Sequence, residues 1–535
     1  MPETVDATPV SAPHEAPWVP KFNPWLIAVV VALAAFMEVL DTSIANVALP
    51  HMAGDLGASN DQSTWVLTSY LVSNAIILPI SGWLAGVFGR KRFFLTCIVL
   101  FTVSSLLCGA APNLAALIVF RVIQGVGGGG LQPMAQAILA DVFPPEKRGM
   151  AFALYGITAV TAPTIGPTLG GWITDNYSWR WIFYINLPVG ILTLFLAARL
   201  VEDPPWLKRA KAAVRIDYIG IGLLALGVGA LQVLLDKGQE DDWFGSRFIV
   251  TLILVSSVCL ISLVIWEWFN ATPIIDVRLF KSFNFAMSNL MMFVLGLSLF
   301  SALVMMPQFL QTLLGYTAES AGLVLSGSGL VLLMEMPLVG VLTSKFPTKY
   351  IIGFGWIALA LAMFYSTQRL DLSIDFRSAA WLRVAQGAGL GFLFVPISLA
   401  CYIGIPPEKS NSVSGIVNFM RNIGSSVGTS MVTTLLARRA QLHQAYLGAH
   451  ATTYDPAFRN QVSGLAQTLV HSGLSAPDAK AQAMGRIYQS LLAQSQALAY
   501  IDTFMVLAIG AAMMFLLSFI LRRNDPSAGS RIAVE

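Results

Sequence analysis

Three ionisable side chains, Glu38, Asp41 and Arg121, lie inside long apolar stretches of the sequence. A charge held away from water is costly, so such a residue usually faces a cavity or a partner and marks an ion pathway. A carboxyl group removed from water takes up a proton more readily, which makes Asp41 a candidate proton carrier. The alternative is a structural, hydrogen-bonding role.

Glu38 lies three residues before Asp41, so both carboxyl groups share one face of a helix. Two neighbouring carboxylates cannot both ionise cheaply. Glu38 is therefore either a second proton or cation site or a residue that lines a water-filled vestibule.

Three other polar residues are candidates for a substrate site. Glu335 precedes Pro337 by two residues, and irregular backbone at membrane depth usually lines a cavity. Glu335 would then attract cationic compounds, or else pair with a basic residue. Arg421 and Asn418 either line a cavity or tie two helices together.

The composition indicates which elements must position these residues. The chain has 535 residues, of which 56% are hydrophobic and 11% charged, with a mean hydropathy of +0.69. A soluble globular protein has roughly 25% charged residues. Apolar stretches of about 20 residues recur, long enough to cross a hydrocarbon core of roughly 30 Å. Since only helices satisfy the backbone there, we predict an all-α polytopic membrane protein.

Fourteen membrane spans are predicted, and both termini are expected in the cytoplasm. If the N-terminus lies in the cytoplasm, 19 of the 32 Lys and Arg residues fall in cytoplasmic tails and loops, whereas five fall in short loops on the opposite side of the membrane. This is the positive-inside bias. The predicted spans are 24–49, 63–88, 93–111, 114–139, 149–173, 181–200, 216–236, 248–268, 284–313, 319–344, 350–367, 379–404, 412–437 and 497–521.

An internal repeat divides the chain. Arg121, Gln124 and Gly125 recur 262 residues later as Arg383, Gln386 and Gly387. We predict two homologous halves of six helices, with a substrate cavity at their interface. The predicted parts are a cytoplasmic tail (1–23), an N-terminal half (24–200), two inserted helices (216–268), a C-terminal half (284–521) and a second tail (522–535).

The outside segment 438–496 is too long for a turn. Asp455 and Pro456 are typical of a helix start, Gly473 of a helix end, and Ser475 of a second start. We predict a periplasmic helical hairpin, with an unstructured linker as the alternative.

Several motifs resemble those of one family. The segment from Gly82 to Lys91 resembles the motif after the second span of the major facilitator superfamily, and Arg121–Gly129 resembles that of the fourth. Ala162–Gly171 resembles the antiporter motif, and Leu40–Pro50 resembles the first-span signature of fourteen-span drug:proton antiporters, the EmrB-type exporters in particular. The conformational residues of these motifs would be Gly82, Gly89, Arg90, Gly166, Pro167, Gly170 and Gly171.

The sequence departs from the family pattern in three places. The acid usual in the second-span motif is Gly86, so a charge latch built on it is absent or made otherwise. The first glycine of the antiporter motif is Ala162. The acids Glu38 and Glu335 are not expected from the pattern.

The resemblance implies proton-driven export of hydrophobic or cationic drugs from the bacterial inner membrane by alternating access. Asp41, Arg121 and Glu38 would couple protons, although Arg121 could instead bind backbone carbonyls. The substrate site would include Glu335, Arg421, Asn418, Asn46 and Gln124. EmrB-type exporters work with a periplasmic adaptor (EmrA-like) and an outer-membrane channel (TolC-like), so both are expected partners.

Other functions are less well supported by the sequence. A dedicated exporter of a metabolite, siderophore or lipid, and a non-transporting membrane scaffold or sensor, remain alternatives. The chain has no phosphate-binding Gly-x-x-x-x-Gly-Lys loop, and its five histidines are scattered. We therefore expect no enzymatic activity, no cofactor, no metal site and no nucleic-acid partner.

Overall fold

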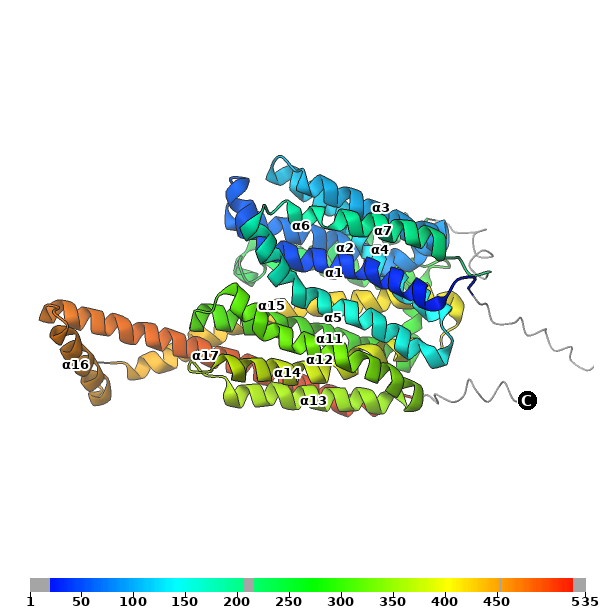
Figure 1. The fold of residues 1–535 in the computed structure, drawn as a ribbon. Helices are drawn as coiled ribbons and strands as arrows, with labels where there is room; N and C mark the ends of the chain where they lie inside the picture. The colour runs from blue at the N-terminus through cyan, green and yellow to red at the C-terminus, as the bar shows by residue number, and fades with distance from the viewer. Residues whose placement is uncertain (1–19, 206–215, 453, 523–535) are drawn as a thin grey trace, which may run out of the picture.

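The computed structural model describes residues 20–205, 216–452 and 454–522, and within them the chain is helical, without a strand (Figure 1). Most of the two predicted tails lies outside these residues. The N-terminal half contains α1 (Pro24–Asp55), α2 (Asn60–Phe88), α3 (Arg90–Gly109), α4 (Leu114–Val142), α5 (Pro145–Asn176), α6 (Trp181–Tyr184) and α7 (Asn186–Leu200).

The rest of the chain continues this pattern. The inserted pair is α9 (Tyr218–Lys237) and α10 (Arg247–Phe269), joined by the short helix η2 (Trp243–Gly245). A second short helix, η3 (Val277–Lys281), leads into the C-terminal half. That half contains α11 (Phe283–Leu314), α12 (Ala318–Lys345), α13 (Thr348–Arg369), α14 (Phe376–Ala400), η4 (Pro407–Lys409), α15 (Ser410–His450), α16 (Pro456–His471) and α17 (Ala476–Ser518).

Local sequence signals explain where the helices begin. The Asn23 side chain accepts a hydrogen bond from the Trp25 backbone and caps α1. Ser59 and Gln62 form a reciprocal capping box at α2. Such caps satisfy backbone N–H groups that have no partner inside the helix.

Thirteen helices of the described residues are long and apolar enough to cross a membrane, with α6 and α7 together making one of them. The predicted span 412–437 lies in α15, which is not among the thirteen. α15 carries Asn418, Arg421 and Asn422, and it packs against α2, α4, α11 and α17. A helix surrounded by protein can be more polar than one that faces lipid. The start of α1 and the end of α17 lie at the same end of the bundle (Figure 1), which requires an even number of crossings and supports α15 as the fourteenth.

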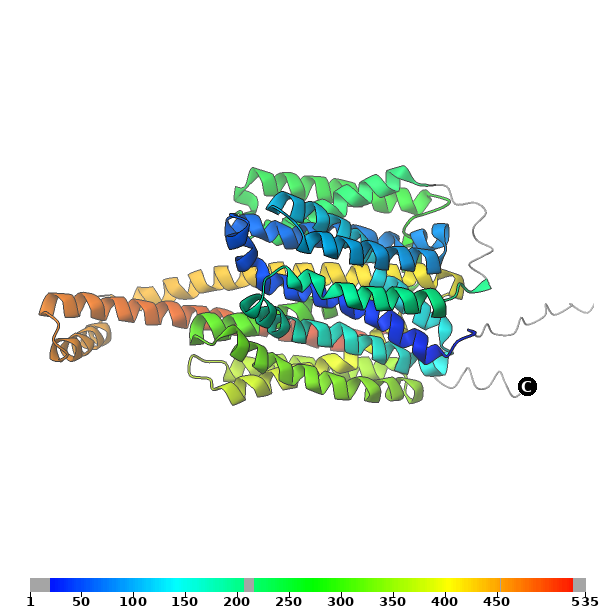
Figure 2. The ribbon, with the colours of Figure 1, turned by 45° about the horizontal axis from the view of Figure 1, so that its top comes forward.

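The segment between the last two spans is helical. α15 and α17 extend beyond the bundle, and α16 folds back beside the extension of α17 (Figure 2). Asp455 caps α16 and Ser475 caps α17, so both predicted helix starts are confirmed. Gly473, between them, has a φ of +101°, a conformation that glycine adopts readily.

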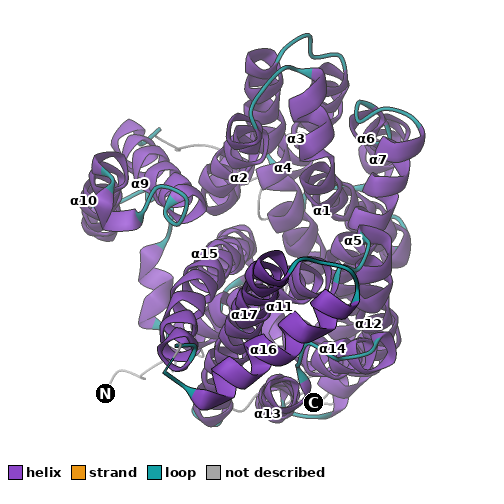
Figure 3. Cartoon of the chain, turned by 90° about the vertical axis from the view of Figure 1, so that its left-hand side faces the viewer, coloured by secondary structure: helices purple, strands orange, loops and turns teal. Residues whose placement is uncertain are grey.

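The inserted helices lie at the edge of the bundle beside α2 (Figure 3). Lys237 donates to Thr64 of α2 at 2.7 Å, and Thr68 of α2 donates to Asp236. Trp243, in the turn after α9, donates its indole N–H to Thr434 of α15 at 3.1 Å. The inserted pair therefore contacts both halves.

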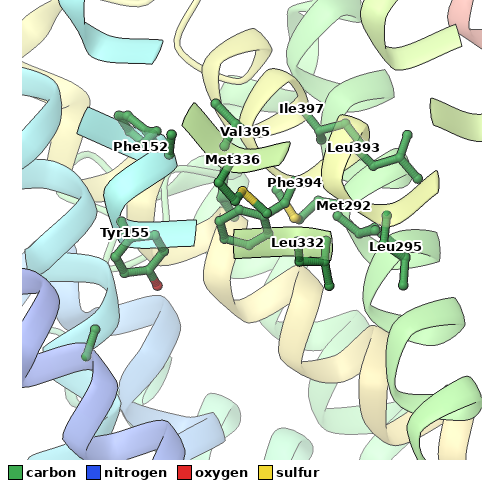
Figure 4. Packing of buried hydrophobic residues seen from close by; sticks show 14 of the residues in the cluster. Phe152, Tyr155, Met292, Leu295, Leu332, Met336, Leu393, Phe394, Val395 and Ile397 are labelled. Atoms are coloured by element: carbon green, nitrogen blue, oxygen red, sulfur yellow. The ribbon is translucent and has the colours of Figure 1, made fainter. Parts of the chain in front are cut away.

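The halves pack against each other through α5 and α12. A Cβ atom at Gly149 would lie 2.1 Å from the Thr343 hydroxyl oxygen, and one at Gly340 would lie 3.0 Å from the Cα of Met150. Small residues permit such close packing where no hydrophobic effect drives helices together. Deeper in the bundle, the Tyr155 ring stacks on Phe394 of α14 with centroids 5.9 Å apart, next to Met336 (Figure 4).

Candidate functional site

A buried ion pair lies in the N-terminal half. Arg121 of α4 donates to the Asp41 carboxylate of α1 at 2.6 Å, and both side chains are at most 1% exposed. The Arg121 guanidinium also donates to the Val66 carbonyl of α2 at 3.1 Å and lies 4.2 Å from the centroid of the Tyr70 ring. Arg121 therefore contacts both the acid and a backbone carbonyl.

Two amides complete the surroundings of Asp41. Gln124, one turn after Arg121, donates to Asp41 Oδ1 at 3.0 Å while its own oxygen accepts from Arg121 at 2.8 Å. Asn186, at the start of α7, donates to the same Oδ1 at 2.7 Å and to Ser105 of α3 at 3.0 Å. The charged carboxylate thus has donors from α4 and α7. Charged hydrogen bonds of this kind contribute about 1.5–3 kcal/mol each.

The two charges of this pair depend on each other. Removing one partner of a buried ion pair costs roughly 3–5 kcal/mol, because the other charge stays behind uncompensated. Any change that neutralised Asp41 would leave Arg121 in that position.

Glu38 has a separate set of partners. Tyr70 donates its hydroxyl to Glu38 Oε1 at 3.0 Å, and Asn74 donates to the same oxygen at 3.0 Å. Gln132 of α4 donates to Glu38 Oε2. Tyr70 thus contacts both acid sites, with its ring against Arg121 and its hydroxyl on Glu38.

Gln132 connects Glu38 to the C-terminal half. Its side-chain oxygen accepts from the Tyr155 hydroxyl at 3.0 Å and from the Arg421 guanidinium of α15. One turn along α4, Gln136 accepts from Asn418 of α15 at 2.8 Å. Arg421 and Asn418 therefore meet the N-terminal half through two glutamines of α4.

Two predicted substrate residues lie apart from this network. Glu335 of α12 is half-buried, and its Oε2 has no hydrogen-bond partner among the described residues. The Glu335 side chain lies against α14, because a Cβ atom at Gly391 would be 2.2 Å from Glu335 Oε2. Asn46 is exposed, just over one turn beyond Asp41 on α1. Gln124, predicted to bind substrate, instead contacts Asp41 and Arg121.

The second-span motif contains a charge latch with an unexpected acid. Gly89 has a φ of +88° and precedes α3, and Arg90 pairs with Asp141 of α4, both side chains being 2% exposed. A Cβ atom at Gly82 would lie 2.7 Å from the Asn411 carbonyl oxygen of α15. A Cβ atom at Gly86, where the family has an acid, would meet nothing within 4 Å.

The fifth-span motif shapes the contact between α5 and α1. Pro167 has no N–H, so the Pro163 carbonyl four residues earlier lacks its helical donor. The Ser43 hydroxyl of α1, two residues from Asp41, donates to this carbonyl at 3.3 Å. A Cβ atom at Gly166 would lie 2.3 Å from the Ser43 hydroxyl oxygen, and one at Gly170 would lie 3.0 Å from the Ile44 side chain, so both glycines are in close contact with α1. A Cβ atom at Gly171 would meet nothing within 4 Å.

Sequence reasoning missed five residues of this site, which are Tyr70, Asn74, Gln132, Tyr155 and Asn186. Each is an uncharged polar residue inside an apolar stretch, and a survey limited to charged residues passes over them. Among the described residues, no group of three His, Cys, Asp or Glu side chains could hold a metal ion.

Comparisons with known proteins agree with this geometry. The Major Facilitator Superfamily profile matches residues 31–429. The multidrug export protein EmrB of Haemophilus influenzae is 42% identical over 81% of this chain and 84% of its own length. The fatty acid resistance protein FarB of Neisseria gonorrhoeae is 37% identical over 83% of this chain and 87% of its own.

A solved structure shows the same fold. The proton:xylose symporter XylE has a TM-score of 0.58 and 14% identity over 94% of this chain and 97% of that one. At this identity the likeness concerns the fold alone. The chain belongs to the major facilitator superfamily and is a multi-pass membrane transporter.

Proposed function

We propose that the protein is a proton-driven multidrug efflux antiporter of the bacterial inner membrane, with both termini in the cytoplasm. The observation that carries the proposal is the buried Asp41, held by Arg121, Gln124 and Asn186. The similarity to multidrug export proteins supports the export of drugs.

The coupling follows from the loss of one charge. When Asp41 takes up a proton, Arg121 loses its ionic partner, and the present arrangement of the helices becomes less stable. Substrate binding and protonation then oppose each other if each favours a different state of the two halves. The halves rock about the cavity between them, as parallel-repeat transporters do.

Glu38 is the route by which this change reaches the other half. A proton on Glu38 would turn one oxygen from acceptor into donor, and Gln132 would have to reorient. Since Gln132 also accepts from Arg421, the contact between α4 and α15 would change with it. Glu38 is proposed as a second proton site on this basis.

The substrate site is proposed at the interface of the halves. Arg421 and Asn418 contribute polar groups there, with Tyr155 and Phe394 as an aromatic surface. Gln124, Asn46 and Glu335 join when the halves move, with Glu335 selecting cationic compounds. Gly82, Gly166 and Gly170 provide the close helix contacts along which such movement occurs.

The extension formed by α15, α16 and α17 is proposed to bind a periplasmic adaptor of the EmrA kind, which in turn contacts a TolC-like outer-membrane channel. Three tyrosines on this extension are exposed, Tyr446, Tyr454 and Tyr488. Tyrosine is enriched in protein interfaces. Replacing Tyr446 and Tyr488 by Ser should abolish adaptor co-purification while transport in isolated vesicles continues.

Everted membrane vesicles test the function. With a pH gradient, acid inside, the vesicles should accumulate several structurally unrelated drugs, and nigericin should abolish accumulation while valinomycin should not. Accumulation that survives nigericin would refute proton coupling. Accumulation of a single compound class would refute the multidrug assignment.

A further inference from the structure

A second arginine repeats the geometry of Arg121 in the other half. Arg383 of α14 is 2% exposed, and it donates to Gln386 at 2.8 Å, as Arg121 donates to Gln124 at 2.8 Å. Arg383 also donates to the Ala302 carbonyl of α11 at 3.3 Å, much as Arg121 donates to Val66. The two arginines therefore share a bond to a glutamine three residues on and a bond to a backbone carbonyl.

The counter-charge is missing. Among the described residues no carboxylate pairs with Arg383, and its Nε is buried without a hydrogen-bond partner. Glu335, on the facing helix α12, lies instead against Gly391, eight residues further along α14. Eight helical residues span roughly 12 Å at 1.5 Å per residue, too far for a direct bond.

Arg383 lines a small cavity between the halves. Its wall comes from Pro163 and Thr164 of α5, Leu303 of α11 and Ser328 of α12, with Gly387 beside Arg383. The space open to the centre of a water-sized molecule is about 10 Å³. This volume suits one water-sized occupant, since roughly 10–15 Å³ is the lower limit for a single water.

A buried charge without a partner is costly, and buried charges in proteins are paired or bound to an ion. We propose that Arg383 and this cavity bind a compact monovalent anion, which serves as the counter-charge that Asp41 provides in the other half. The anion is a free halide, for which chloride is the probe.

Binding at this place would bias the conformation of the transporter. The cavity wall contains α5 of the N-terminal half and α11, α12 and α14 of the other half. An occupant held by Arg383 therefore favours the arrangement in which these helices surround it.

Thermal unfolding of the purified full chain tests the site. At constant sodium, chloride in place of gluconate should raise Tm. Arg383→Gln should abolish this shift, whereas Arg369→Gln, an exposed arginine of the same half, should preserve it. No shift with chloride, or a shift retained in Arg383→Gln, would overturn the proposal.

A second variant avoids dependence on the folding of Arg383→Gln. Leu303→Asp places a carboxylate in the cavity beside Arg383 and should give a folded, monodisperse protein whose Tm no longer responds to anions. Leu303→Asn, of the same size without the charge, should be less stable and should still respond. A Leu303→Asp protein that is less stable than Leu303→Asn, or that still responds to anions, would contradict the site.

These readouts are independent of transport. A protein that exports drugs without any anion response refutes only the site, and one with the anion response but no transport refutes only the proposed function.

Discussion

Arg121 and Arg383 each donate to a glutamine three residues further along their helices at 2.8 Å, but only Arg121 faces a carboxylate. The sequence repeat is thus reproduced in three dimensions, and the acid is the part that differs. Among the described residues, the buried Arg383 of the C-terminal half is therefore hydrogen-bonded but has no carboxylate as its counter-charge.

Asn186 is expected to hold the Asp41 carboxylate in place. Asn186→Ala removes the hydrogen bonds from Asn186 to Asp41 and to Ser105. Because the bond to Asp41 is a charged one, its loss should cost about 1.5–3 kcal/mol of stability. Thermal unfolding of the purified protein measures this cost. An unchanged Tm would contradict this role.

Gln132 is expected to carry the change at Glu38 to α15. Gln132→Leu removes the amide group and with it the bonds to Glu38, Tyr155 and Arg421. Turnover should fall at least about tenfold, which corresponds to roughly 1.4 kcal/mol, while substrate binding persists. Gln368→Leu, at an exposed position of α13, is the control, and equal activity of both variants would exclude the connection.

The Arg90–Asp141 pair should stabilise the fold. Arg90→Met leaves a buried carboxylate without its partner and should cost roughly 3–5 kcal/mol. Adding Asp141→Leu should recover most of this loss, as replacement of a buried pair by apolar residues often does. Thermal unfolding of the single and double variants measures the recovery, and its absence would show that the two residues act independently.

Ser43 and Pro167 should depend on each other. Ser43→Ala leaves the Pro163 carbonyl without a donor, and an unsatisfied buried group costs about 1–3 kcal/mol. In a Pro167→Ala background the helix supplies its own N–H, so Ser43→Ala should then have little effect on Tm. Equal losses in both backgrounds would show that the Ser43 contact does not replace the missing helical bond.

The membrane spans could be predicted from the sequence because a run of apolar residues is a local property. α15 is too polar to be recognised by this property, because its polar residues are compensated by neighbours that the sequence does not specify. The resemblance to antiporters implied the pairing of Asp41 with Arg121, whereas spacing alone left their contact undetermined.

The rest of the site could not be predicted because it depends on which helices meet. A glutamine such as Gln132 has no local signal that separates it from another glutamine inside an apolar stretch, such as Gln232. Glu335 was singled out by its charge and a nearby proline, yet its position against Gly391 is set by the packing of α12 on α14. Likewise, the acid that pairs with Arg90 comes from α4, 51 residues after Arg90 in the sequence.

The central claim is that a proton on Asp41 drives export. The most direct test is substrate-driven proton release from proteoliposomes holding a pH gradient, comparing wild type with Asp41→Asn and with Asp371→Asn, an exposed acid outside the spans, as control. We expect flux in wild type and control and none in Asp41→Asn, whose folding and drug binding persist. Proton release retained in Asp41→Asn would contradict it.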